Sequence, residues 1–347
     1  MIDAAGRTVI PGLMDLHAHE YVPDVLPGCL YFGVTTTRDQ GSAVAPLVAW
    51  GEAIAAGVSE GPRLGYGAVQ YYSDWAWDDE QGQGVEPEAD PEHVARSIAL
   101  DAAFGAQHVK TRTFRRWDID ARFVAEAHRR GMRVTGHCAY PLPLLAAGMD
   151  SKEHLGFCPR GEDRIYDDFV QLYRAAGVAV VPTISYLTLG ARIDRPHMFD
   201  GDAELAPFLP PADNFDSMVQ LSPEERRSFI RLAGHWREGT AKLARAGVML
   251  GTGTDVWQLP DAVHLELEEL VRAGLSPLAA IRAATGDAAR ILGAERDLGT
   301  IETGKLADLV ILNADPLADV RNTRRIGVVV QNGRIVDRVA LRARGSR

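Results

Sequence analysis

The chain has 347 residues, of which 46% are hydrophobic and 24% charged, and its formal net charge at pH 7 is -10. This composition is typical of a soluble globular protein, long enough for one large domain or two ordinary ones. No basic block stands out and no apolar run reaches the length of a membrane span. We therefore expect neither a nucleic acid nor a membrane as a partner.

The N-terminal sequence and the cysteines indicate the cellular compartment of the protein. MIDAAGRTV lacks the basic-then-apolar order of a signal peptide. Cys29, Cys138 and Cys158 are odd in number and form no CxxC motif, which indicates reduced thiols. These features predict a cytoplasmic protein, although an exported precursor that had lost its leader would have the same pattern.

Up to about residue 295, β-rich runs alternate with amphipathic or alanine-rich stretches. The runs that predict strands are 8–19, 33–39, 63–71, 106–112, 132–138, 150–157, 178–186 and 248–255. The stretches that predict helices are 45–56, 91–104, 118–130, 162–176, 222–246 and 261–273, followed by two short helices that begin at Ser276-Pro277 and Gly286-Asp287. Repeats of this kind predict an α/β fold of the (β/α)8 TIM-barrel type rather than an open doubly wound sheet.

Two connections, 70–90 and 187–221, are too long to be plain turns. Both follow predicted strands, so we expect them at the carboxyl-terminal face of the barrel, where such enzymes hold their active sites. Their aromatic residues favour ordered lids or pocket walls over disordered insertions.

Beyond about residue 295 the pattern changes to short strands, over 299–313, 325–333 and 334–338, with no helices between them. The sequence QNGR is a strong hairpin signal. We predict a barrel over 8–295 and a small β-sandwich-like unit formed by 1–7 and 296–347.

Chemistry-bearing side chains stand where the predicted strands end. His17 and His19 are two apart in GLMDLHAHE, so on a strand they share a face and make half of a metal site. Later predicted strands carry or end in Lys110, His137, His154 and Asp255, listed here in chain order. Because the carboxyl ends of barrel strands meet at one rim, we expect all six side chains to converge.

These motifs resemble the amidohydrolase superfamily of metal-dependent hydrolases. VIPGLMDLHAH, TGHCAY, KEHLGF, GTGTD and ETGKLADLVILNADPL match its signatures, and the resemblance runs from about residue 2 to 337. Within the superfamily, the chain resembles imidazolonepropionase-like and prolidase-like members. In relatives a β-rich segment precedes the equivalent of IDAAGRTVIPGL, so we expect the small β unit to be incomplete at its N-terminus.

The resemblance implies a centre of two divalent ions, with zinc as the first expectation. His17 and His19 would hold the more buried ion and His137 and His154 the other. Lys110, carboxylated on its amine, would bridge them. Asp255 would bind the first ion and carry protons.

Two alternatives to this centre stay open: Lys110 as an ordinary cation paired with Asp255, and His108, on the same strand face, as a rival ligand. Ligand type alone also allows Mn, Co or Fe.

The implied reaction is hydrolysis of a C–N bond in a small amide, cyclic amide or dipeptide by a hydroxide held between the ions. Hydrolysis of an ester, lactone or phosphotriester at the same site, one-metal deamination of a heterocycle, and a catalytically silent barrel are the alternatives. A homo-oligomer is left open.

Candidate substrate contacts are Arg112, which could hold a carboxylate, Tyr140 and Tyr186. Prolidase-like relatives have a tyrosine two residues after the histidine of strand five, whereas Tyr140 is three residues after His137, which argues against dipeptidase activity. Three further residues, Glu20, Arg38 and Asp39, are either substrate contacts or structural supports.

Overall fold

The computed structural model of the protein describes residues 3–19, 23–42, 44–65, 67–70, 91–111, 117–137, 141–155, 164–191, 203–209, 221–256 and 259–345. Within these ranges, none of the helices has the length and apolar character needed to cross a bilayer.

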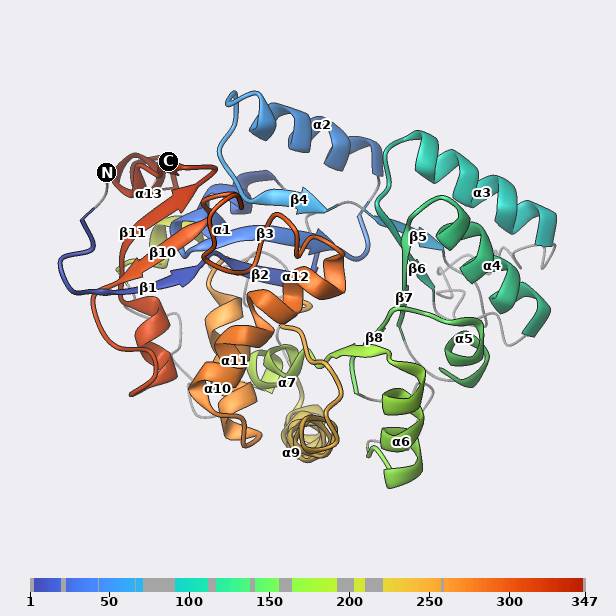
Figure 1. The fold of residues 1–347 in the computed structure, drawn as a ribbon. Helices are drawn as coiled ribbons and strands as arrows, with labels where there is room; N and C mark the ends of the chain where they lie inside the picture. The colour runs from blue at the N-terminus through green and yellow to red at the C-terminus, as the bar shows by residue number, and fades with distance from the viewer. Residues whose placement is uncertain are drawn as a thin grey trace.

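The described strands β2 to β9 form two parallel sheets in the middle of the molecule (Figure 1). One sheet contains β2 (Leu13–Ala18), β3 (Val34–Asp39) and β4 (Arg63–Gly65). The other contains β5 (Gly67–Gln70), β6 (His108–Thr111), β7 (Arg133–Gly136), β8 (Ser151–Glu153) and β9 (Ala179–Val181). Because β4 pairs with β3 and β5 pairs with β6, β4 and β5 are consecutive parts of one barrel strand.

The eighth barrel strand is the segment 249–255, and its backbone hydrogen bonds close the ring. Val180 N donates to Met249 O and Gly251 N to Val180 O, which joins the segment to β9. On its other side, Leu16 N donates to Thr252 O and Asp255 N to His17 O, which joins it to β2. The predicted (β/α)8 architecture is therefore confirmed.

The predicted helices are present with ends within a few residues of their expected positions. They are α2 (Val44–Ala55), α3 (Pro91–Ala103), α4 (Trp117–Arg129), α6 (Asp167–Ala176), α9 (Pro223–Arg245), α10 (Ala262–Arg272), α11 (Pro277–Ala283) and α12 (Gly286–Leu292). Short helices that were not predicted include η1 (Pro23–Val25), α1 (Leu26–Tyr31), α5 (Pro141–Ala147) and η2 (Ala206–Phe208).

Two predictions about strand seven and its connection need correction. The predicted strand 178–186 ends at Val181, because α7 (Ile184–Ala191) begins three residues later. The connection expected over 187–221 therefore begins inside a helix and contains η2. Apart from residue 70, the other long connection, 70–90, lies outside the described residues.

The predicted single strand 8–19 is wrong, because the chain changes sheets at Gly12. β1 (Thr8–Pro11) pairs antiparallel with β10 (Leu309–Leu312), and only β2 belongs to the barrel. A Cβ atom on Gly12 would lie 2.1 Å from Thr35 Oγ1, so the turn needs a residue without a side chain. The division into a barrel and a small β unit stays a prediction, and we propose Gly12 as its boundary in place of residue 8.

The small β unit is a four-stranded antiparallel sheet, in which β10 also pairs with β11 (Ile326–Gln331) and β11 with β12 (Arg334–Ile335). The QNGR signal is a tight hairpin turn, with Asn332 and Gly333 both left-handed at φ 49° and 75°. A 3-10 helix, η3 (Val320–Arg324), lies between β10 and β11, and α13 (Arg338–Gly345) follows the sheet, so the expectation of an all-strand segment is wrong.

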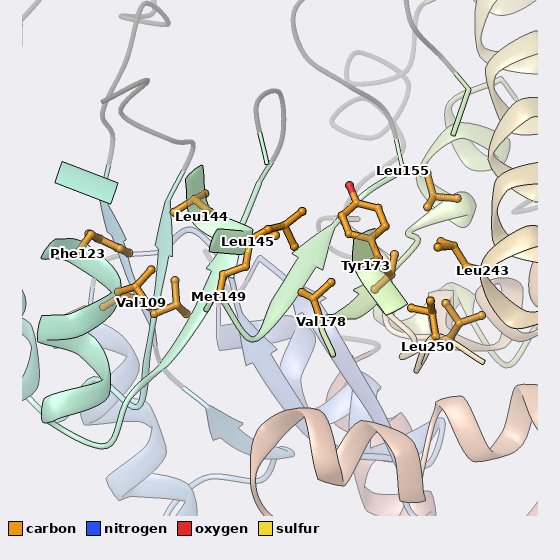
Figure 2. Close-up of a cluster of buried hydrophobic side chains, with 14 of the residues drawn as sticks. Val109, Phe123, Leu144, Leu145, Met149, Leu155, Tyr173, Val178, Leu243 and Leu250 are labelled. Atoms are coloured by element: carbon orange, nitrogen blue, oxygen red, sulfur yellow. The ribbon is translucent and has the colours of Figure 1, made fainter. Parts of the chain in front are cut away.

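Hydrophobic burial joins these parts. One cluster lies between the sheet β6–β9 and helices α4, α6 and α9; the members labelled in Figure 2 include Val109, Phe123, Leu144, Tyr173, Val178, Leu243 and Leu250. A second cluster combines Leu13 and Val34 of the barrel with Leu267 of α10 and with Val310 and Val329 of the antiparallel sheet. The small β unit therefore shares a core with the barrel.

His264 is a buried polar link in this shared core. Its Nδ1 lies 2.9 Å from Thr323 Oγ1 of η3, and its Nε2 lies 2.9 Å from Phe32 O, at the end of α1. Burial lowers the pKa of His264 to about 4, partly offset by the bond to Phe32. The imidazole is therefore neutral at pH 7.

We predict that His264 makes the folded state sensitive to acid. Because its pKa is about 4 in the folded protein and its ordinary value is 6.5, the unfolded chain takes up this proton first as pH falls. The neutral side chain of His264 therefore adds about 3 kcal/mol to the free energy of unfolding above pH 6.5, relative to acid conditions. This contribution is lost as the pH falls from 6.5 to 4. Urea denaturation of His264→Gln across this range should show a flatter pH dependence than the wild type. An identical pH dependence in both proteins would contradict the prediction.

Candidate metal centre

The predicted ligands lie at the carboxyl-terminal rim of the barrel, where backbone hydrogen bonds between neighbouring strands hold three of them directly. His137 N donates to Thr111 O, His154 N to Val181 O, and Asp255 N to His17 O. The eighth strand lies close to the first because Gly253 has no side chain. A Cβ atom there would lie 2.6 Å from the Cβ of His17.

The side chains converge on one point. One ligand atom each from His17, His154 and Asp255 lies within 4.8 Å of the other two. Asp255 Oδ1 lies 2.8 Å from His19 Nε2, and Lys110 Nζ lies 3.0 Å from His17 Nε2. The ring of His137 lies 4.7 Å from that of His154. The structure thus brings all six residues together, and their roles as ligands stay a prediction.

The electrostatics favour neutral imidazoles beside an ionised carboxylate. Burial holds the pKa of His17 well below 6.5, and the charge of Lys110 adds to the effect. Burial also holds the pKa of His154 well below 6.5, against the opposing charge of Asp255. Burial works to raise the pKa of Asp255, but His154, His19 and Lys110 together hold it below its usual value. Neutral imidazole and carboxylate are the forms that bind metal ions.

Three residues at this rim have a left-handed backbone that side chains seldom adopt. They are His154 at φ 62°, Thr183 at φ 54° and Asp255 at φ 51°. Such conformations cost on the order of 1–3 kcal/mol each and persist only where the surroundings enforce them. Their concentration at the rim indicates that the fold holds these side chains in place for a function.

A buried carboxylate orients His17. Glu153 Oε2 lies 2.8 Å from His17 Nδ1, and Glu153 Oε1 accepts a hydrogen bond of 2.7 Å from Arg38 Nη2. Arg38 is 1% and Glu153 0% exposed. Arg38 Nε also donates to Leu16 O on β2 (2.7 Å). Because Nδ1 of His17 is engaged by Glu153, Nε2 is directed toward the site.

A second carboxylate, Asp15, fixes the backbone beneath the site. Its Oδ1 accepts from His17 N (3.0 Å) and from Thr254 N (3.1 Å), and its Oδ2 accepts from Thr254 Oγ1 (2.7 Å). Burial raises the pKa of Asp15 despite these hydrogen bonds. Asp15 thus ties strand one to strand eight next to His17 and Asp255.

The remaining candidates fall into different places. His108 is buried with Nε2 2.8 Å from Asp39 O, and burial lowers its pKa to about 3. Asp39 accepts hydrogen bonds from Gly41 N and Ser42 N, so it stabilises the turn after β3. Arg38 supports Glu153, as described above.

Tyr186 lies in the first turn of α7 with 41% of its surface exposed, and burial and the charge of Asp255 raise its pKa. Glu20, Arg112 and Tyr140 lie outside the described residues.

Two supporting carboxylates, Asp15 and Glu153, were not predicted from the sequence, and only Asp15 had a signal there. Asp15 precedes His17 by two residues, so the alternation that placed His17 and His19 on one face also applies to Asp15. Glu153 had no such signal, because strict alternation places it opposite its neighbour His154. The left-handed backbone at His154 breaks the alternation.

Comparison with known protein families assigns the chain to one of them. Residues 33–336 match the Amidohydrolase family. The chain belongs to this family. The resemblance inferred from the sequence motifs is therefore confirmed.

Individual relatives agree with this assignment. Ochratoxinase of Aspergillus niger is 27% identical over 203 residues, which span 57% of this chain and 36% of ochratoxinase, about a third of its length. An imidazolonepropionase of Aromatoleum aromaticum is 54% identical over 46 residues, or 13% of this chain and 11% of that protein. The crystal structure of a Bifidobacterium longum protein assigned as a prolidase has a TM-score of 0.75 at 26% identity, covering 100% of this chain and 87% of its own.

We predict that Glu153→Gln strongly destabilises the protein. The substitution leaves the guanidinium of Arg38 buried without a counter-charge, a change that costs on the order of 3–5 kcal/mol. Urea denaturation at pH 7 measures the loss. The control is Glu60→Gln, which breaks the exposed pair with Arg344 and should cost about 1 kcal/mol or less. Equal losses of unfolding free energy in Glu153→Gln and Glu60→Gln would contradict the role of Glu153.

Proposed function

We propose that the protein is a divalent-metal-dependent hydrolase that cleaves a C–N bond in a small-molecule substrate. The observation that carries this proposal is the cluster of the buried His17 and His154 with the partly buried Asp255 at the rim of an amidohydrolase-family barrel. Relatives named prolidase, imidazolonepropionase and ochratoxinase support a substrate with an amide, cyclic amide or dipeptide bond.

The residues present suit a metal ion. His154 Nε2 is buried, has no hydrogen-bond partner among the described residues, and lies 3.8 Å from Asp255 Oδ2. An unpaired polar atom in the interior is unfavourable unless a ligand completes it. Imidazole nitrogen together with carboxylate oxygen is a donor set that zinc accepts.

We further propose two ions, with His17 and His19 on one, His137 and His154 on the other, and Lys110 between them. Lys110 is buried and its Nζ lies 3.0 Å from the same His17 nitrogen that would bind metal. An ammonium at that position repels a cation. A carbamate, formed when the neutral amine adds carbon dioxide, is an anion with two oxygen donors.

Within this proposal, Asp255 moves the proton. Divalent ions, when bound, lower the pKa of water to near neutrality. Asp255 is held at 2.8 Å from His19 Nε2, and its lowered pKa keeps it ionised at pH 7. Its carboxylate can therefore accept the proton of the attacking water and return it to the leaving nitrogen, which would otherwise depart as a poor anion. Zinc as the metal and the cytoplasm as the location are parts of the same proposal.

Asp255→Asn should lower kcat by about 10²–10⁴, because the amide keeps the shape of the side chain but accepts no proton. The assay is hydrolysis of a panel of amides and dipeptides, with metal content measured on the same samples by mass spectrometry. A metal-loaded variant that turns over at the wild-type rate would remove Asp255 from the mechanism.

The purified protein should hold close to two divalent ions per chain, and Lys110→Ala should lose at least one ion and most activity. A short carboxylate added in solution should partly restore both, because it fills the bridge. His17→Ala should not be restored in this way, since a diffusing anion does not reproduce a fixed imidazole. Bicarbonate should speed reconstitution of the apo-protein.

One ion per chain, unchanged in Lys110→Ala and insensitive to bicarbonate, would contradict the two-ion centre. That result would favour the alternative of a one-metal deaminase acting on a heterocycle.

A further inference from the structure

A buried carboxylate on α10 contacts the strand-seven side of the metal centre through the backbone. Glu266 is 0% exposed. Its Oε2 accepts a hydrogen bond of 2.7 Å from Ser185 N, and its Oε1 accepts one of 3.2 Å from Ile184 N. These are the first two N–H groups of α7, which have no partner within their own helix.

The residue just before α7 is Thr183, at the position where a threonine ordinarily caps a helix with its hydroxyl group. Here that hydroxyl lies 2.6 Å from His154 Nδ1. Glu266 therefore does for α7 what Thr183 would otherwise do, and the hydroxyl of Thr183 is left to hold the imidazole.

The backbone of Thr183 needs such an external support. Its φ of 54° is unfavourable for a β-branched residue, and this conformation persists only if the surroundings fix it. Glu266 fixes the two peptide groups that follow Thr183. If α7 began elsewhere, Thr183 would relax and its hydroxyl would move away from His154.

The orientation of His154 depends on this hydroxyl. When Nδ1–H donates to Thr183 Oγ1, Nε2 carries a lone pair and faces Asp255 Oδ2 at 3.8 Å. Without that acceptor the ring could rotate or adopt the other tautomer, and Nε2 would cease to be a ligand.

We propose that Glu266 is a positioning residue, which fixes the metal-binding nitrogen of His154 through the N-terminus of α7 and Thr183. The inference rests on the proposed function, because it assigns His154 to a metal ion. Burial raises the pKa of Glu266 to about 8, and a protonated carboxyl group keeps a carbonyl oxygen that can accept one of these two hydrogen bonds.

The test is titration of the apo-protein with Zn²⁺ by isothermal calorimetry, with thermal stability measured in parallel. Glu266→Met removes both acceptors and should weaken zinc binding about 10-fold to 100-fold, the usual effect of losing a residue that orients a ligand. Glu266→Gln keeps one acceptor and should stay closer to the wild type. Thr183→Val should also weaken binding about 10-fold to 100-fold.

The double variant separates positioning from general destabilisation. If Glu266 acts through Thr183, Glu266→Met combined with Thr183→Val should bind zinc within about twofold of Thr183→Val alone. The matched control is Glu269→Met, on the same helix, where the buried carboxylate pairs with Arg237 and Arg272. This control should lose stability and keep its zinc affinity within about twofold.

Each result is decisive. A wild-type apo-protein that binds no Zn²⁺ would overturn the proposed function itself. Two results would overturn the role of Glu266 and leave the proposed function standing. One is wild-type zinc affinity in Glu266→Met. The other is a double variant whose loss of zinc affinity equals the product of the losses in the two single variants. If Glu266→Met is recovered only unfolded, folded Thr183→Val decides: wild-type zinc affinity in that variant would break the path from Glu266 to His154 and overturn the role of Glu266.

Discussion

The geometry of the candidate metal centre depends on one carboxylate in the interior of the barrel. Glu153 is shared between the guanidinium of Arg38 and the imidazole of His17, and both contacts are shorter than 3 Å. A carboxylate that is removed from water is tolerated only when charge and hydrogen bonds compensate it, and Arg38 supplies both. Because Arg38 also donates to Leu16 O, this interaction connects β8, β3 and β2 next to His17.

The other supports follow the same rule: a group on one strand fixes a side chain on another. Asp15 of β2 binds Thr254 of the eighth strand, and Thr183 after β9 binds His154 after β8. The geometry of the site is therefore a property of the closed barrel rather than of any local motif. It exists only after β2 and segment 249–255 have joined through the bonds of Leu16 and Asp255. This explains why candidate ligands far apart in the chain can lie within a few ångströms of one another.

Much of this arrangement could be predicted because two periodic rules govern it. Alternation along a strand placed His17 beside His19, and the common direction of barrel strands placed Lys110, His154 and Asp255 at the same rim. The rest depended on the backbone. The change of sheet at Gly12 arises from a close approach to Thr35, and the engagement of Glu153 arises from the left-handed residue that follows it. Neither a contact across the fold nor a positive φ at histidine has a local sequence pattern, so neither was predicted.

The pairing of β1 with β10 has a consequence for how the chain is made. Pro11 lies opposite Leu309, so about 300 residues separate the two partners along the chain. At a synthesis rate of about 5–20 residues per second, residues 8–11 wait about 15–60 s on the ribosome before their partner strand is complete. During that interval the edge of an unpaired apolar strand is exposed next to the first barrel strand. Closing the small sheet is therefore a late event in synthesis, and residues 8–11 are among the last to become ordered.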